Sequence, residues 1–518
     1  MKSKRILFIG IFMIVLSHVQ PAMGQNRDRF NNFKQKRSVR FQNFKDKKQQ
    51  ELDEFRRKRN IEFAAAMGNT KWKAFDKQTP TPKPVDKDVP PIISDDNRRQ
   101  DEKRSIKVTP YIISVPEPQP NPITPIKENK DIQKYGTFSF YGTKMKARWG
   151  DLASFRLASK DEKGLGKAYE LLTDPKYDNL LYDCLELRKS YQLCDWAYYL
   201  MLGQLSETVC GKGSNEAVFL QGVLYHQSGY MMRFGFEQGN HNLHLLVRFD
   251  TTPFLMAPFV VEGKIFYAPD NVKSSKVHIF DKAFDGEKEM TLSISKSPLL
   301  AKDLSEEKTI HARSYPLVVK SIINKNLINF FNDYPASYRD DNFMTKWAYY
   351  GNTPVSGEIR NQVYPKLREA IQNVPQLNAV NLLLNWVQPL HPQDNSKRNL
   401  SGQVGLPYGN DDAMWGRDRT FFAEETLYYP YSDCEDHAIL FSHLVRDLVG
   451  LDVALVYYPG HLATAVCFDV DVAGDSFIVD GRKFVIADPT LYRGKVGETM
   501  SQYWNTDPKE IKLIVLDR

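Results

Sequence analysis

Residues 431–451 read YSDCEDHAILFSHLVRDLVGL, a short polar stretch that leads into a helical pattern of apolar residues. Ser432 and Glu435 stand three residues apart directly before the apolar run, which is the pattern of a capping box. The spacing predicts a helix with Ser432 as its N-cap and Cys434 as its second residue, ended by Gly450. The apolar residues expected on one face of this helix are Leu440, Leu444 and Leu448.

Cys434 is one of only five cysteines, and it falls at the polar end of this helix rather than in the apolar stripe. At a helix N-terminus, unpaired backbone N–H groups and the positive end of the dipole favour a thiolate and lower the pKa of a thiol. Three neighbouring acids, Asp433, Glu435 and Asp436, oppose this effect by Coulomb repulsion. A nearby imidazolium would therefore activate the thiol more than the helix alone.

Two later residues could provide that activation. His461 begins the strand-like run HLATAVCFDV 27 residues after Cys434, and Asp488 follows FVIA a further 27 residues on. In nucleophilic catalysis a thiol gives its proton to an imidazole, which a carboxylate holds in the correct tautomer and orientation. Each residue alone also has an ordinary interpretation, as an inert cysteine, a satisfied polar histidine and a turn aspartate. Their order and their elements together favour a Cys–His–Asp site.

The stretches DCEDHAILFSHLVRDLVGLDVALV, GHLATAV and ADPT resemble the transglutaminase-like superfamily of papain-type cysteine enzymes, as an exported bacterial member, over about residues 370–495. The resemblance implies an α+β fold in which a cysteine helix packs on an antiparallel sheet. It also implies Cys434 as nucleophile, His461 as general base and acid, and Asp488 as orienting acid, with acyl transfer through a thioester. Water as acceptor would give peptidase or deamidase activity, and an amine would give cross-linking.

Two departures from the family pattern leave the shape of the cleft open. Ser432 stands where the family often has glycine, and Leu462 follows the histidine where bulkier aromatic residues often occur nearby. The natural oxyanion donor is the backbone N–H of Cys434. Gln388 and Trp386 are candidate side-chain donors, although both also fit a role as packing or capping residues.

A metal site is disfavoured by the spacing of the possible ligands. Cys434, His437 and His443 share the predicted helix, but no CxxC or HxxxH pair completes a site. We expect neither a metal nor another cofactor.

The first 24 residues are predicted to be a secretory signal peptide. They combine a basic start, an apolar run at 6–16 and the small residues Ala22 and Gly24, with cleavage expected before Gln25. The apolar run is too short to span a membrane, and no later stretch approaches the necessary length. Removal of the three basic residues of the signal lowers the formal net charge from +7 to +4, which gives no argument for a nucleic-acid partner.

Residues 25–78 are predicted to form a basic helical arm. Phe30, Phe41, Leu52 and Phe63 recur at eleven-residue steps, which gives a long helix one apolar seam. The arm either packs on the protein itself or docks a partner or an acidic surface. Residues 79–127 contain proline-rich runs such as TPTPKPVDKDVPP and are expected to be a linker or an extended wrap.

Two tandem units are predicted to follow, a degenerate domain at 128–300 and a catalytic domain at 301–518. A shift of 221 residues superimposes GKGSNEAVFLQGVLYHQSGYMMRF on SDCEDHAILFSHLVRDLVGLDVAL, and a shift of 219 superimposes NLHLLVRFD on HLATAVCFD. The first shift places Gly213 or Ser214 where a cysteine is needed. His241, His244 and Asp270 fall near the other site positions. The alternative is a coincidence between two ordinary helix-plus-sheet units. Further helices are expected around 317–332 and 359–390.

The sequence therefore predicts an exported cysteine peptidase, amidase or acyltransferase that acts on a protein or peptide substrate. Its final compartment could be the periplasm, the cell surface or the medium. The alternative is a catalytically silent binding or assembly protein that keeps the fold, with the arm as the contact for a partner. A third possibility is an interaction scaffold whose arm is the active part.

Overall fold

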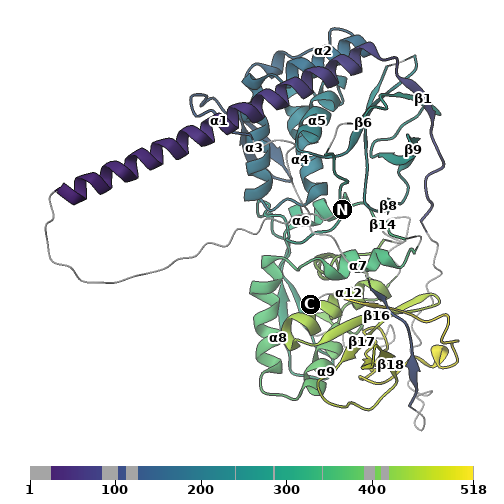
Figure 1. The fold of residues 1–518 in the computed structure, drawn as a ribbon. Coiled ribbons are helices and arrows are strands. Elements are labelled where there is room, and N and C mark those ends of the chain that lie inside the picture. The colour runs from purple at the N-terminus through teal and green to yellow at the C-terminus, as the bar shows by residue number, and fades with distance from the viewer. Residues whose placement is uncertain are drawn as a thin grey trace, which may run out of the picture. The chain divides into compact units, whose positions relative to one another are not determined.

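The computed structural model describes residues 25–83, 103–112, 126–239, 241–283, 286–340, 342–389, 403–409 and 419–516. The chain divides into two compact units, Met1–Lys58 and Arg59–Arg518 (Figure 1). The predicted signal peptide and most of the predicted proline-rich linker lie outside the described residues. The chain is a mixed α+β protein with curled antiparallel sheets, which confirms the predicted fold class at that level.

Helix α1 (Gln25–Asn69) carries the eleven-residue repeat. In the first unit, Phe33, Phe44 and Phe55 are exposed on this helix. The last part of α1 belongs to the second unit, where the buried Phe63 packs against the rings of Tyr169 and Phe280 at centroid distances of 5.0 and 5.3 Å. The helix thus ends in a hydrophobic core.

The first half of the larger unit combines four helices with a six-stranded sheet. The helices are α2 (Glu162–Leu172), α3 (Asp178–Ser190), α4 (Asp195–Cys210) and α5 (Asn215–Gln227). The sheet has the order β1-β11-β6-β7-β10-β9, and all its pairings are antiparallel. Its strands are β1 (Lys73–Asp76), β6 (Met232–Glu237), β7 (Leu243–Val247), β9 (Ala257–Val261), β10 (Lys264–Ala268) and β11 (Lys276–Ile279). Helix α5 packs on β6 and β7.

This sheet curls until its two edges meet. Strand β1 pairs with β11 at one edge, and the chain directly after β1 reaches the other edge, where Gln78 N donates to Pro258 O of β9 at 2.9 Å. Two smaller pairings complete this half: β4 (Gly136–Phe140) with β5 (Thr143–Ala147), and β8 (Thr252–Pro253) with β14 (Ser337–Tyr338).

The second half contains α6 (Lys325–Asn332), α7 (Thr345–Asn352), α8 (Tyr364–Ile371), α9 (Gln376–Val387), α11 (Ala423–Tyr428) and α12 (Cys434–Leu444). A small sheet joins β12 (Lys308–His311), β13 (Val318–Ser321) and β15 (Gln403–Val404). The main sheet has the order β2-β18-β19-β17-β16-β20-β3. Its strands are β2 (Ser105–Lys107), β3 (Tyr111–Ile112), β16 (Asp452–Tyr458), β17 (His461–Cys467), β18 (Ser476–Val479), β19 (Arg482–Ile486) and β20 (Lys512–Val515). Helix α12 packs on β16 and β17.

The main sheet must also curl strongly. Strands β2 and β3 occupy its opposite edges, on β18 and β20, yet they are separated only by residues 108–110. Four residue steps span at most about 14 Å, whereas a flat seven-stranded sheet would be about 29 Å wide. Residues 105–112 therefore close the sheet into a barrel-like form.

The two curled sheets share one topology. The order β11-β6-β7-β10-β9 matches β20-β16-β17-β19-β18 strand for strand along the chain, and each set follows a helix, α5 or α12, that packs on its first two strands. The observed arrangement places the start of α12 beside the start of β17, where the candidate site lies. Among the described helices, none combines the length and apolar character needed to cross a bilayer.

Candidate active site

Helix α12 begins one residue later than the sequence predicts. Asp433 is the N-cap and Asp436 its reciprocal partner in a capping box, so Cys434 is the first helical residue rather than the second. The predicted N-cap, Ser432, uses its hydroxyl elsewhere, on Pro407 O at 3.2 Å and His437 Nε2 at 3.0 Å. The predicted pairing of Ser432 with Glu435 is therefore corrected to Asp433 with Asp436.

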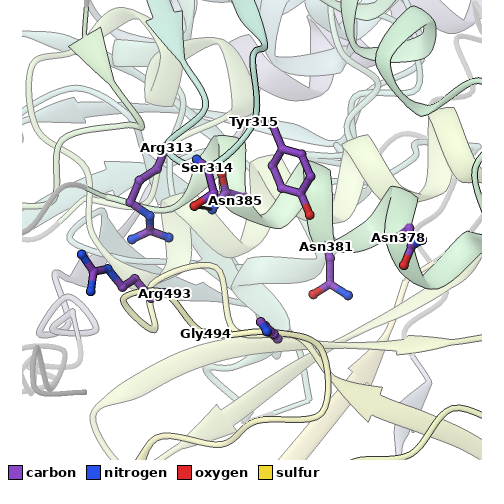
Figure 2. Close-up of a pocket in the computed structure, with 9 residues that line it drawn as sticks. Arg313, Ser314, Tyr315, Asn378, Asn381, Asn385, Arg493 and Gly494 are labelled. Carbon is purple, nitrogen blue, oxygen red and sulfur yellow. Dashed lines mark hydrogen bonds between the residues drawn. The ribbon is translucent and has the colours of Figure 1, made fainter. Parts of the chain in front are cut away.

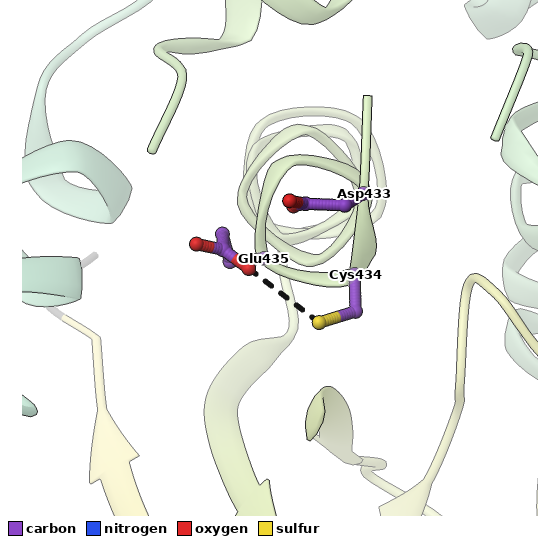
Figure 3. Close-up of side chains that lie close together, drawn as sticks. All are labelled: Asp433, Cys434 and Glu435. Atoms are coloured by element: carbon purple, nitrogen blue, oxygen red, sulfur yellow. Dashed lines mark hydrogen bonds between the residues drawn. The ribbon is translucent and has the colours of Figure 1, made fainter. Parts of the chain in front are cut away.

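The Cys434 thiol faces the start of strand β17. Its Sγ atom accepts a hydrogen bond from the backbone N–H of Leu462 at 3.4 Å, and Leu462 directly follows His461. The thiol also donates to Glu435 Oε2 at 3.5 Å (Figure 3), and the Cys434 side chain is buried. The backbone donor and the helix N-terminus both favour a thiolate, because each places positive charge at the sulfur.

His461 and Asp488 form a buried pair. His461 Nε2 and Asp488 Oδ2 are 2.8 Å apart, and each residue is only 3 % exposed. A carboxylate accepts, so Nε2 carries the proton of the neutral imidazole and Nδ1 presents a lone pair. The structure thus brings the two predicted residues together in the arrangement that leaves Nδ1 to exchange a proton.

Asp488 is held ionised by Thr490 as well as by His461. Its Oδ1 atom accepts hydrogen bonds from the backbone N–H and the hydroxyl of Thr490, both at 3.0 Å. Burial alone would raise the pKa of Asp488, but the charge and hydrogen bond of His461 and the two bonds from Thr490 outweigh it and hold the pKa below its usual value. Sequence reasoning took Asp-Pro-Thr as a turn and missed Thr490, although a threonine two residues after the acid was a signal.

Two tyrosines stack on the imidazole. The Tyr503 ring lies parallel to the His461 ring, with centroids 5.3 Å apart and an interplanar angle of 6°. Tyr458 stacks in turn on Tyr503 at 4.7 Å. These contacts fix the plane of the imidazole. Tyr503 could not be found from the sequence, because it comes from a short 3-10 turn with no motif spacing to the site.

Glu435 is a second acid beside the thiol. Its Oε1 atom accepts from the Thr420 hydroxyl at 3.3 Å. Burial alone would raise the pKa of Glu435, but the Lys346 ammonium and a hydrogen bond with Asp433 outweigh it and lower the pKa. The thiol therefore has an ionised carboxylate as neighbour, which opposes ionisation of Cys434.

The two candidate oxyanion side chains have other roles in the described structure. Gln388 Nε2 donates to Leu491 O at 2.9 Å and Gly494 O at 2.8 Å, so this amide anchors the loop that follows Asp488. Trp386 is fully buried in the core, and its Nε1 atom has no hydrogen-bond acceptor among the described residues. The backbone N–H of Cys434, which stands at the first position of α12, stays the predicted donor.

The predicted absence of a metal stays a prediction. Asp433, Cys434 and Glu435 each place one possible ligand atom within 4.8 Å of the others (Figure 3). Asp433 already serves as the helix cap, which favours a structural role for it. His437, on the same helix, is bound to Ser432 instead of joining these atoms.

The first half of the larger unit repeats the contact at the thiol. Asn215, the first residue of α5, accepts a hydrogen bond through Oδ1 from the backbone N–H of Leu243 at 2.9 Å. Cys434 and Leu462 make the same contact, and the offset is 219 residues for both partners. Asn215 therefore occupies the cysteine position, which corrects the predicted Gly213 or Ser214.

The other two positions of this second constellation can be assigned in the same way. Asn242 precedes Leu243 as His461 precedes Leu462. Asp270 follows the end of β10 by two residues, as Asp488 follows the end of β19. Asp270 Oδ2 lies 3.5 Å from Nδ1 of His244, which retains a histidine–carboxylate pair one step away from the site position.

Protein-family models, curated proteins and solved structures were all compared with this chain, and none of them matches it. The geometry around Cys434 is therefore the basis for assigning a function.

Proposed function

We propose that this chain is an exported cysteine hydrolase or acyltransferase of transglutaminase-like architecture, which acts on peptide or amide bonds. Cys434 is the nucleophile, His461 the general base and acid, and Asp488 the orienting carboxylate. The observation that carries the proposal is the hydrogen bond from Leu462 N to Cys434 Sγ, because it seats the thiol beside the histidine that Asp488 holds.

The proposed reaction follows from these positions. Nδ1 of His461 takes the proton of Cys434, and the sulfur attacks the carbonyl carbon to give a tetrahedral oxyanion near the backbone N–H of Cys434. The imidazolium returns the proton to the leaving amine as the carbon–nitrogen bond breaks, which leaves a thioester. Water then releases a carboxylic acid, or an amine forms a new amide, and the thiol is regenerated in either case. Asp488 stabilises the imidazolium without taking its proton.

The shared topology supports a duplication of this unit. The same strand order, the preceding helix and the repeated side-chain contact recur at a near-constant offset. In the first copy, asparagines at 215 and 242 replace the nucleophile and the base. We infer that the first copy is degenerate and binds or shields the substrate instead of reacting with it.

A catalytically silent binding protein is the second candidate. The observation that favours it is the carboxylate of Glu435 at 3.5 Å from a thiol that is only 3 % exposed. An ionised acid and burial both disfavour a thiolate.

Alkylation of the thiol separates the two candidates. The full chain is treated with iodoacetamide from pH 5 to 10, and the modification of Cys434 is read by peptide mass spectrometry. The enzyme proposal expects Cys434 to react well below pH 8, and it expects His461→Ala to move the reaction to the range of an ordinary thiol, about pH 8.5.

His241→Ala is the matched control, because His241 is exposed and lies in the first half of the unit. It should leave the profile unchanged. A Cys434 thiol that reacts only above about pH 8 and ignores the His461 substitution would favour the silent protein.

A further inference from the structure

A polar cavity of about 650 Å³ lies in the second half of the larger unit (Figure 2). Three segments line it: the loop between β12 and β13, one face of α9, and the loop after Asp488. Figure 2 shows the asparagines of α9 along one wall, with Arg493 and Gly494 across from them. The lining residues are Arg313, Ser314, Tyr315, Asn378, Asn381, Asn385, Arg493, Gly494 and Lys495.

The charge of this cavity is of one sign. Arg313, Arg493 and Lys495 line it, and among the described residues no acidic side chain does. The remaining lining side chains are amides and hydroxyls. A wall with three cations and several neutral hydrogen-bonding groups is complementary to an anion that also carries polar groups.

Hydrogen bonds hold the walls of the cavity in place. Asn381 Oδ1 accepts from Val496 N at 3.0 Å, which ties α9 to the loop after Asp488. Asn385 Oδ1 accepts from Ser314 N at 2.9 Å, which ties α9 to the loop between β12 and β13. The cavity is thus a preformed site, and its lining does not depend on a ligand to assemble.

Two guanidinium groups are held against one aromatic ring. The Arg313 and Arg493 guanidinium carbons lie 4.8 and 5.1 Å from the centroid of Tyr492. Arg313 also donates to Gln388, the residue that anchors the loop of Arg493. Like charges gathered on one ring repel each other, and an anion bound between them would offset that repulsion.

We propose that this cavity is a binding site for a small polar molecule that carries an oxyanion, either a carboxylate or a phosphate. The guanidinium groups of Arg313 and Arg493 and the Lys495 ammonium bind the oxyanion, and the asparagine amides and the Tyr315 hydroxyl bind its neutral polar groups. The site does not use Cys434 and stands whether or not that residue is a nucleophile.

Isothermal titration calorimetry on the full chain tests the site with three probes: sodium glucuronate, inorganic phosphate and glucose. We expect at least one of the two anions to bind with a dissociation constant below about 10 mM. Its affinity should fall as sodium chloride is raised, because the contacts are charged and solvent-accessible. Binding of glucuronate alone identifies a carboxylate ligand, and binding of phosphate alone identifies a phosphate ligand.

The double variant Arg493→Gln with Lys495→Gln removes two exposed charges and should keep the fold. We expect it to weaken binding of the anion by about tenfold or more. The double variant Lys320→Gln with Lys366→Gln is the control, because both lysines are exposed, form surface ion pairs and lie outside the cavity lining. It should leave the affinity unchanged.

Three results would overturn the proposal. They are no binding of either anion up to about 10 mM, equal binding of glucose and glucuronate, and equal weakening of binding by the two double variants.

Discussion

His437 lies one turn beyond Cys434 on α12 and is fully buried, and its Nε2 atom is hydrogen-bonded to the Ser432 hydroxyl at 3.0 Å. Burial lowers the pKa of His437 to about 4. Burial and the nearby charge of Arg446 also hold the pKa of His443 well below its usual value. The helix that presents the thiol therefore contains two histidines that fold in the neutral form.

This burial predicts a stability that depends on pH. The folded pKa of His437 is depressed, so the unfolded chain binds a proton between about pH 6.5 and 4 that the folded chain does not bind. Stability is fully present above pH 6.5 and falls as the pH falls. From pH 6.5 to 5 the share of His437 is about 2 kcal/mol.

Urea unfolding at pH 7 and pH 5 measures this effect. His437→Gln should show a smaller loss of unfolding free energy between the two pH values than the unsubstituted chain, while the exposed His241→Gln should lose the full amount. Equal losses in all three proteins would show that His437 is not the buried neutral group.

At the scale of elements, the first residue of a helix connects to a strand in both halves of the larger unit. Asn215 joins α5 to β7, and Cys434 joins α12 to β17, each by accepting one backbone N–H. The amide oxygen is a strong acceptor and the thiol sulfur a weak one. The contact is thus a structural link in the first half and a reactive position in the proposed site.

Asn215→Ala should lower the free energy of unfolding by about 1–3 kcal/mol, because the N–H of the buried Leu243 loses its acceptor. Asn215→Asp keeps an acceptor at a helix N-terminus and should restore most of the loss. Gln204→Ala on the exposed face of α4 is the control and should have little effect. Chemical denaturation measures all three, and an Asp variant as weak as the Ala variant would contradict the link.

Helix boundaries were predictable from the sequence only where their end signals were not in use elsewhere. The capping motif before α12 was found, but its N-cap was placed at Ser432, because the sequence does not reveal that this hydroxyl binds Pro407 and His437. The helix predicted at 359–390 is broken before Gln376, where Pro375 occupies the N-cap position of α9. The helix predicted at 317–332 begins only after Asn324, because residues 318–321 pair with β12.

The two-residue error in aligning the halves has a definite origin. The sequence alignment matched Gly229 with Gly450, the glycines after the two helices. Helix α12, however, continues into a π-helix at Val445–Val449 before reaching Gly450, whereas α5 stops at Gln227. The extra residues of the wider turn shift the glycine relative to the helix start. Periodicity could predict the helices but not this change of pitch.

Part of the candidate site was accessible from the sequence, and part was not. Cys434, His461 and Asp488 are recognisable because each sits at the end of an element and the spacing is regular. Tyr503 is not, because the stacking on His461 depends on how the chain returns to the sheet after Asp488. Nor did spacing reveal that Gln388 would anchor the 491–494 loop.

At the scale of the whole molecule, Arg59–Arg518 forms a compact unit that includes the end of α1. Deleting residues 25–58 should therefore change the melting temperature of the rest by no more than about 2 °C, as expected for changes outside a core. Phe63→Ala should instead lower the free energy of unfolding by about 3–5 kcal/mol, because it leaves a cavity beside Tyr169 and Phe280.

Differential scanning calorimetry compares the two changes. A deletion that lowers the melting temperature as much as Phe63→Ala would show that residues 25–58 contribute to the stability of the larger unit.

The closure of the two curled sheets also sets an order of events in folding. Strand β1 meets β11 at residues 276–279, so the first sheet can close once that part of the chain exists. The segment at 105–112 must wait for β18, at a separation of 371 residues from Ser105 to Ser476, and for β20 near the C-terminus. Contacts so distant in sequence form slowly. The sheet that carries His461 is therefore the last to be completed, and until then the edges of β18 and β20 are open to pairing with other chains.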